Sequence, residues 1–255
     1  MSNAFAATRP NVRAVEAARA RLYCAADTAS IATALRLGVT LKDTVGGLKL
    51  GLEYFTANGA QGVDALRALG LPIFLDLKLH DIPNTVAGAI RSIARLDPIL
   101  LTIHAAGGGA MIQAAVGAVR EAEKCRTKII AVTALTSLDE SDLAAVGFAG
   151  STRDVVRRLA DVAIANGADG VVCAPTEVAA LRAQCGPDFL LVVPGIRAAG
   201  QEVGDQKRTL SAGEAVAAGA SYLVVGRPIT QAPDPTAAAR ALVTEIAVAA
   251  GPRLQ

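Results

Sequence analysis

Short apolar runs alternate along the chain with segments of helical periodicity. The apolar runs predict eight strands, at residues 22–27, 47–51, 73–78, 99–104, 129–136, 170–174, 190–196 and 222–227. Helices are predicted where apolar positions recur every three or four residues, at 30–37, 63–69, 85–94, 111–123, 151–166, 177–184, 212–218 and 235–249. Because the strands are apolar on both faces and a helix follows each one, they are expected to lie parallel in one sheet. Eight such units fit a closed barrel better than an open sheet, so the pattern predicts a single (β/α)8 TIM barrel of the α/β class.

The barrel is predicted to span residues 21–255, after an N-terminal extension at 1–20 that is helical or partly disordered. No stretch rich in Pro, Gly and Ser divides the chain, and 255 residues suit one such barrel. Gly59, Gly167 and Gly219 each follow a helical pattern and precede a strand. We expect all three glycines in left-handed turns that end helices at the bottom of the barrel.

Polar residues instead collect where the predicted strands end. They are Asp27, Lys49, Asp76, Lys78, His104, Thr136, Arg197 and Arg227. In (β/α)8 barrels the carboxyl ends of the strands carry the active site, so these side chains are candidates for one pocket. His104 is the exception, because neither a nucleophile nor a metal-binding partner accompanies it, and a structural role is favoured over a ligand-binding one.

The most unusual of these strand ends is Ile-Phe-Leu-Asp76-Leu-Lys78-Leu-His-Asp81. Side chains two apart on a strand share a face, so Asp76 and Lys78 are expected to lie side by side. Burying charge is costly, and a purely structural strand is more simply built from Val or Ile. A structural ion pair is one interpretation, and a reactive site is the other.

Asp27, Lys49, Asp76 and Lys78 come from three successive predicted strands and alternate in sign, and Asp81 follows on the next loop. Each charge in such a row has opposite neighbours, which fixes the side chains and can shift their pKa values.

A second cluster follows the last two predicted strands. It comprises Val-Pro194-Gly-Ile-Arg197, Gly-Asp-Gln206-Lys-Arg and Val-Gly226-Arg227-Pro. Loops after strands seven and eight commonly bind phosphate in this fold, with backbone N–H groups and a cation. The cluster therefore predicts a phosphomonoester substrate, although a surface arginine beside a flexible loop would give the same pattern.

Composition and charge limit the kinds of function that the chain is expected to have. The chain is 52% hydrophobic and 19% charged, which is typical of a globular protein with a large core. Its net charge is only +2, and no basic run is interleaved with aromatic residues, so nucleic-acid binding is not expected. The sequence has no apolar run long enough for a membrane span and no signal-peptide pattern, so a cytoplasmic location is expected.

The four cysteines are far apart in sequence, without Cys-x-x-Cys spacing, and only two histidines accompany them. This argues against a metal site and favours reduced, mostly buried thiols.

The segment from Asp76 to Thr85, Asp-Leu-Lys-Leu-His-Asp-Ile-Pro-Asn-Thr, closely resembles the signature of the orotidine 5'-monophosphate decarboxylase family. The similarity extends to Ala-Ala-Asp27, Gly-Leu-Lys49-Leu-Gly, His104-Ala-Ala-Gly-Gly, Thr-Ala-Leu-Thr136-Ser, Pro194-Gly-Ile-Arg197, Gly-Asp-Gln206-Lys-Arg and Gly226-Arg227-Pro. The resemblance implies release of CO2 from orotidine 5'-monophosphate to give UMP, the last step of de novo UMP synthesis. It also implies that no cofactor or metal is used.

The catalytic residues implied by this resemblance are Lys78, which would protonate C6 of the pyrimidine, with Asp76, Asp81 and Lys49. The substrate-binding residues implied are Asp27, Lys49, Asp76, Asp81, Ile82, Thr85, Thr136, Pro194, Arg197, Gln206, Gly226 and Arg227. In this scheme Asp27 and Lys49 hold the ribose, Thr136 contacts the pyrimidine, and Arg197, Gln206, Gly226 and Arg227 lie at the phosphate. The resemblance further implies a homodimer in which Asp81 reaches into the partner's site.

Two alternatives remain at this point. One is a magnesium-dependent sugar-phosphate decarboxylase of the same superfamily, which is expected to have a metal-binding acid near the second strand, where this chain has Lys49. The other is a nucleotide-binding barrel without catalytic activity.

Overall fold

The computed structural model describes residues 10–122, 125–196 and 210–250. Eight parallel strands close into a barrel in sequence order, and β1 pairs with β8. The strands are β1 Leu22–Ala25, β2 Gly47–Gly51, β3 Ile73–Leu79, β4 Leu100–His104, β5 Lys128–Val132, β6 Gly170–Val172, β7 Leu190–Pro194 and β8 Tyr222–Val225. The predicted (β/α)8 TIM barrel is confirmed.

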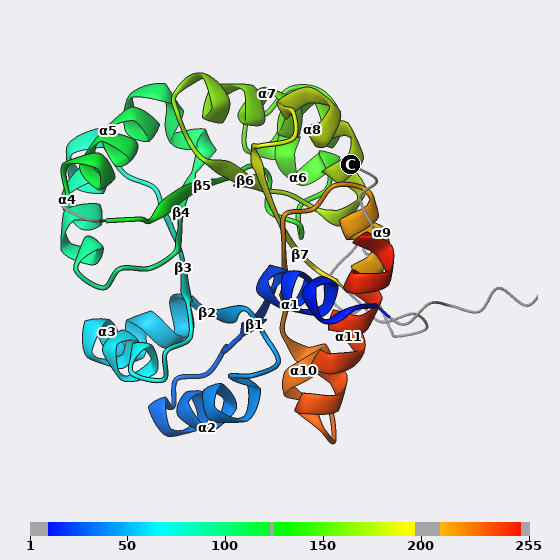
Figure 1. Ribbon diagram of the computed structural model, residues 1–255. Coiled ribbons are helices and arrows are strands. Elements are labelled where there is room, and N and C mark those ends of the chain that lie inside the picture. Colours follow the sequence, from blue (N-terminus) through cyan, green and yellow to red (C-terminus); the bar gives the residue numbers. More distant parts are fainter. Residues whose placement is uncertain (1–9, 123–124, 197–209, 251–255) are drawn as a thin grey trace, which may run out of the picture.

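Most of the helices form a ring outside the barrel, whereas α1 Val12–Arg21 lies over one end of it (Figure 1). The other α-helices are α2 Ile31–Leu41, α3 Leu52–Arg67, α4 Pro83–Ala94, α5 Gly108–Glu121, α6 Glu140–Ala145, α7 Thr152–Ala165, α8 Val178–Cys185, α9 Ala212–Ala217, α10 Arg227–Thr230 and α11 Pro235–Ala250. Two short 3-10 helices, η1 Ala105–Gly107 and η2 Pro175–Glu177, follow β4 and β6. In the described part of the chain, no helix combines the length and apolar character needed to cross a membrane.

The N-terminal extension includes α1, which begins at a cap where the Asn11 side chain accepts the Ala14 N–H. This helix packs against α11 and leads directly into β1, at the amino-terminal end of the strands (Figure 1). Residues 1–9 lie outside the described part.

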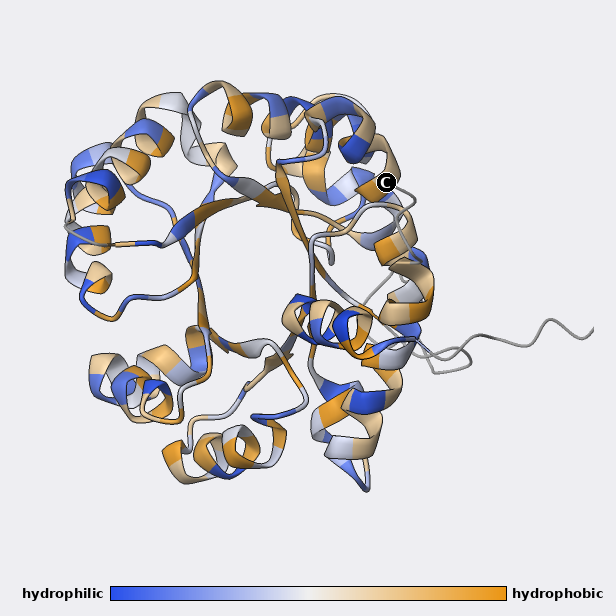
Figure 2. Ribbon diagram, in the orientation of Figure 1, coloured by the Kyte–Doolittle hydropathy of each residue, from blue (hydrophilic) through white to orange (hydrophobic). Residues whose placement is uncertain are grey.

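Two apolar layers build the core. The larger layer lies between the strands and the helices, whose inner faces are apolar and outer faces polar (Figure 2). The smaller layer fills the inside of the barrel with Tyr23, Ala25, Phe74, Leu100, Ile130, Val192 and Val224. Tyr23 meets Phe74 and Tyr222 edge to face, with ring centroids 6.2 and 5.6 Å apart. Because this layer fills the barrel, the polar residues further along the strands stand on a solid apolar floor.

The predicted strands begin within one residue of the observed ones, but several overrun their carboxyl ends. β1 ends at Ala25 rather than at Asp27, β5 at Val132 rather than at Thr136, and β8 at Val225 rather than at Arg227. These three polar residues therefore lie on loops or, for Arg227, at the start of α10. After β1 and β5 the apolar run continues past the strand because loop residues such as Ala26 and Ala134, at 1% and 6% exposure, are still buried.

The prediction for Gly59 was wrong. Gly167 and Gly219 have left-handed φ values of 81° and 112° between a helix and a strand, as expected. Gly59, with φ 57° and ψ −154°, instead interrupts α3, which begins at Leu52. Gly70, with φ 77°, provides the turn that leads into β3. A glycine break inside a helix has the same sequence signature as a helix end.

A pair of stacked imidazoles supports the loop between β3 and α4. The rings of His80 and His104 lie 5.2 Å apart with an interplanar angle of 24°. The His104 Nδ1 atom is buried and has no hydrogen-bond partner among the described residues. Burial lowers the pKa of His104, and the nearby His80 and Lys78 lower it further. The contact fits the predicted structural role of His104.

We therefore predict that His104 titrates below its ordinary pKa of 6.5 in the folded protein. Between the lowered pKa and 6.5 the unfolded chain binds a proton that the folded chain does not. The free energy of unfolding should consequently fall as the pH drops through that window. NMR titration and urea unfolding at several pH values measure the two effects.

The His104→Phe variant is the control, since it retains a ring against His80 and removes the titrating group. The unfolding free energy of the wild type should fall relative to that of the variant as the pH drops through the window. Titration of His104 at or above 6.5 would contradict the assignment.

Candidate active site

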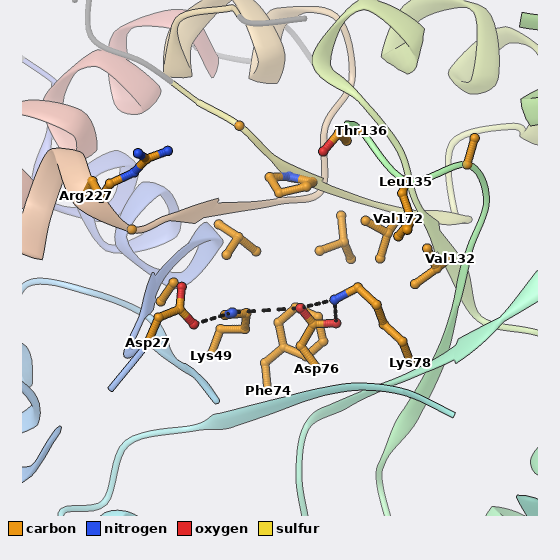
Figure 3. Close-up of a pocket in the computed structure, with 17 residues that line it drawn as sticks. Asp27, Lys49, Phe74, Asp76, Lys78, Val132, Leu135, Thr136, Val172 and Arg227 are labelled. Atoms are coloured by element: carbon orange, nitrogen blue, oxygen red, sulfur yellow. Dashed lines mark hydrogen bonds and ion pairs between the residues drawn. The ribbon is translucent and has the colours of Figure 1, made fainter. Parts of the chain in front are cut away.

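A pocket of about 420 Å³ opens at the carboxyl ends of the strands (Figure 3). It brings together eight of the residues singled out from the sequence, namely Asp27, Lys49, Asp76, Lys78, Thr136, Pro194, Gly226 and Arg227. The apolar floor of the barrel forms its base through Ala25, Phe74, Val192 and Val224. Arg197 and Gln206, the other two residues predicted at the phosphate, lie outside the described residues.

Four charged side chains form a row across this pocket (Figure 3). The Lys49 ammonium donates to Asp27 Oδ1 at 2.8 Å, and it lies 3.8 Å from Asp76 Oδ2. The Lys78 ammonium lies 2.8 Å from each of the two Asp76 carboxylate oxygens. The predicted alternation of acid and base is therefore present as a continuous row of contacts.

The inner members of the row are well shielded from water. The side chains of Lys49 and Asp76 are 11% and 14% exposed, Lys78 is 31% exposed, and Asp27 is 55% exposed. Buried charges are tolerated when each has an opposite partner, and removing one partner of a buried pair is strongly destabilising. Asp76, between two lysines, is the central charge of the row.

Lys78 has an uncommon backbone conformation. Its φ is 49°, and Asp97 is the one other non-glycine residue with positive φ among the described residues. The pairing between β3 and β4 is also irregular here, because Leu75 pairs with Leu101 whereas Leu79 pairs with Ile103. Four steps along β3 thus correspond to two along β4. Such strain in a strand is retained where the surrounding structure enforces it, most often at functional sites.

Thr102 on β4 occupies the irregular part of this pairing. Its hydroxyl accepts the backbone N–H of Lys78 at 2.8 Å and donates to Asp76 Oδ1 at 2.9 Å. The sequence interpretation did not single out this residue. The available signal was a hydroxyl in the otherwise apolar run Leu100-Leu-Thr-Ile103, on the same face as the barrel floor.

Gly51, at the end of β2, is a second residue that the sequence interpretation missed. A Cβ atom at this position would lie 3.0 Å from Lys49 Nζ and 3.3 Å from Asp27 Oδ1. Glycine here leaves room for the ion pair of Lys49 with Asp27.

The two ends of the row differ in character. Val132, Leu135 and Val172 lie at the Lys78 end, and Arg227 lies at the Asp27 end (Figure 3). The site therefore suits a ligand with an anionic group near Arg227 and a less polar group against the apolar side chains at the Lys78 end. Between them, Asp27 and Lys49 offer an acceptor and a donor to hydroxyl groups.

Asp81, Ile82 and Thr85 do not line the pocket of their own chain. All three are exposed at the start of α4, and Asp81 Oδ1 accepts the backbone N–H of Ile82 at 2.7 Å. Within one chain, Asp81 is thus separate from the row of four charges.

All four cysteines are free thiols, as predicted. Cys24 and Cys173 are buried, and Cys125 and Cys185 are half-buried. Burial, with a smaller contribution from Asp27, raises the pKa of Cys24 to about 12, so this thiol stays protonated at neutral pH.

Comparison with known proteins gives a consistent result over most of the chain. A sequence model of the "Orotidine 5'-phosphate decarboxylase / HUMPS family" matches residues 20–242. A curated orotidine 5'-phosphate decarboxylase of Paramagnetospirillum magneticum is 55% identical over 229 residues, covering 88% of this chain and 97% of the relative. The enzyme of that name from Thermobifida fusca is 52% identical over 228 residues, covering 89% and 96%.

Solved structures agree with these relatives. The crystal structure of orotidine 5'-phosphate decarboxylase from Lactobacillus acidophilus aligns with a TM-score of 0.79 at 37% identity, covering 88% of this chain and 98% of that one. The Pyrococcus horikoshii structure of the same name gives a TM-score of 0.71 at 27% identity, covering 88% and 98%. The fold, the row of charges and these similarities agree, and the chain belongs to the orotidine 5'-phosphate decarboxylase / HUMPS family.

Proposed function

We propose that this chain decarboxylates orotidine 5'-phosphate to uridine 5'-phosphate, without a metal or an organic cofactor, as the last step of UMP biosynthesis. One geometric observation carries the proposal. The Lys78 ammonium is held by both oxygens of Asp76 at the edge of a pocket whose floor is apolar. The curated relatives that carry this enzyme name, at 50% identity or more, support the choice of substrate.

The chemistry explains why a fixed cation is needed. Breaking the bond between C6 and the carboxylate releases CO2 and leaves an electron pair on C6, in the plane of the pyrimidine ring. No adjacent carbonyl is placed to delocalise that pair as an enolate, so its stabilisation must be electrostatic. An ammonium already held at the carbon provides this without reorganisation during the reaction, and such preorganised stabilisation is usually the largest single contribution to catalysis.

Lys78 then completes the reaction. Its Nζ atom transfers a proton to C6, a C–H bond forms, and the neutral amine recovers a proton from solvent. Asp76 keeps the ammonium in place and lies close to the substrate carboxylate, where repulsion between like charges contributes to raising the ground state. Lys49 balances the charge of Asp76 on its other side.

The remaining residues bind the nucleotide in this proposal. Asp27 and Lys49 hold the ribose hydroxyls, and Thr136 contacts the pyrimidine. The phosphate lies at the other end of the pocket, where the proposed contacts are Pro194, Arg197, Gln206, Gly226 and Arg227. Binding energy from this remote group can be used to close the site around the reacting carbon.

Lys49 also argues against the magnesium-dependent alternative. Its ammonium lies between the carboxylates of Asp27 and Asp76, at 2.8 and 3.8 Å. A divalent cation bound by the same two carboxylates would meet that positive charge directly.

We predict that Lys78→Ala abolishes decarboxylation while the protein still folds. The lost charge and proton donor together should lower kcat by more than about 10⁴-fold. Folding should persist because Asp76 retains contacts with Thr102 and Lys49, and alanine tolerates the backbone of position 78 no worse than lysine. The measurement is the loss of orotidine 5'-phosphate absorbance in the presence of a chelator.

Lys42→Ala, which removes a lysine just after the carboxyl end of α2, is the matched control and should keep the wild-type rate.

The wild-type protein tests the two alternatives. Loss of its activity in chelator would favour the metal-dependent alternative. Tight binding of uridine 5'-phosphate without any turnover would favour the non-catalytic one.

We further propose that the enzyme is a homodimer in which Asp81 of one subunit completes the site of the other, with Ile82 and Thr85 beside it. Asp81 is exposed and lies outside its own pocket, so it is free to face a second chain. Ile82 next to it is 66% exposed, so its side chain is also accessible to a second chain.

Mixed dimers test this arrangement. When Lys78→Ala and Asp81→Asn proteins are combined, each heterodimer has one site with an intact Lys78 and an intact Asp81 from the other chain. Random exchange of subunits should restore about a quarter of the wild-type rate, since half of the dimers are mixed and one of their two sites is intact. As the control, each variant is taken through the same exchange procedure alone. If the mixture of the two variants gained no decarboxylase activity after exchange, the shared site would be rejected.

A further inference from the structure

Thr102 is a fully buried hydroxyl residue in an otherwise apolar strand. Its exposure is 0%, and its neighbours Leu101 and Ile103 are buried among aliphatic side chains between the strands and the helices. It does not line the pocket, so a bound ligand would not touch it. A buried hydroxyl is costly unless it is hydrogen-bonded, and its two contacts both involve the charged pair.

The direction of these hydrogen bonds is fixed by chemistry. The Lys78 backbone N–H can only donate, so the Thr102 oxygen accepts it at 2.8 Å. The hydroxyl hydrogen is then available to Asp76 Oδ1, 2.9 Å away, which also receives the Lys78 ammonium. One side chain thus links the backbone of the proposed proton donor to the carboxylate that holds its ammonium.

The hydroxyl also replaces a missing strand contact. Leu75 pairs with Leu101 and Leu79 with Ile103, so the regular ladder is interrupted between them, where Lys78 lies. Lys78 has a left-handed φ of 49° within this interruption. A non-glycine residue keeps such a conformation when neighbouring groups enforce it, and Thr102 provides a fixed acceptor at this point.

We propose that Thr102 is a positioning residue that sets the backbone of Lys78 and the rotation of the Asp76 carboxylate, and thereby places the Lys78 ammonium. The expected effect on kcat rests on the proposed decarboxylase function, whereas the expected effect on the geometry of Lys78 and Asp76 does not. It predicts that the hydroxyl, rather than the volume of the side chain, is required.

Two substitutions separate hydroxyl from volume. Thr102→Val keeps the shape and removes the hydroxyl, and Thr102→Ser keeps the hydroxyl and removes a methyl group. We expect Val to lower kcat by about 100-fold, the usual effect of a small displacement of a reacting group. KM should stay within about threefold, because the ribose and phosphate groups are bound elsewhere in the pocket. Ser should remain within about threefold of wild type in both constants.

Thr127→Val is a matched control. Thr127 is also buried, at 5% exposure, and its hydroxyl donates to the Pro98 carbonyl at 2.6 Å, just before β5 begins and so at the opposite end of the strands from the charged row. This variant loses a comparable buried hydrogen bond and should keep the wild-type kcat. If Thr102→Val does not fold, Thr102→Ala compared with Thr102→Ser answers the same question.

Crystal structures of the Val and Ser variants provide a readout independent of catalysis. In the Val variant, Lys78 should leave the left-handed region or its ammonium should lose one of the two Asp76 oxygens, and in the Ser variant both should stay. A wild-type protein that does not turn over orotidine 5'-phosphate would reject the proposed function, and the structures would still decide the role of Thr102. The inference would be overturned if the Val variant had the kcat of the wild type, or if the Val and Ser variants lost kcat equally. An unchanged Lys78 geometry in the Val variant would also overturn it.

Discussion

The contact between the Lys78 ammonium and the Asp76 carboxylate is the interaction on which the site depends. Both oxygens of Asp76 lie 2.8 Å from the ammonium, in a place where 14% of the aspartate side chain is exposed. Away from bulk water such a pair is stronger and its geometry is more sharply defined. A reaction that leaves an electron pair on carbon needs a cation held in this way, because a mobile cation would first have to reorganise.

The barrel makes this contact possible by giving the charges a rigid support. The inner layer around Phe74 fills the barrel below Asp76, so the carboxylate cannot move down into the core. On β2, Gly51 leaves room for Lys49 and Asp27 to pair. The cost of burying these charges is offset because opposite charges alternate along the row. Fold and site are therefore coupled, since the same strands provide both the apolar floor and the charged row.

Much of this arrangement could be predicted from the sequence, because it follows from local periodicity. Alternation along a strand places Asp76 and Lys78 on one face, and the fold brings the carboxyl ends of strands together. The left-handed backbone of Lys78 and its contact with Thr102 could not be predicted, because they depend on a shift in register between two strands. Gly59 was misread for a related reason, since a break inside a helix and a helix end share one local pattern. The partner of Asp81 is likewise beyond the reach of local periodicity.

The most direct test of the account is a crystal structure of the protein with bound uridine 5'-phosphate, the proposed product. The account predicts that Lys78 Nζ lies within about 3.5 Å of C6 of the pyrimidine and keeps its contact with Asp76. A nucleotide bound in the pocket with the Lys78 ammonium directed away from C6 would contradict it.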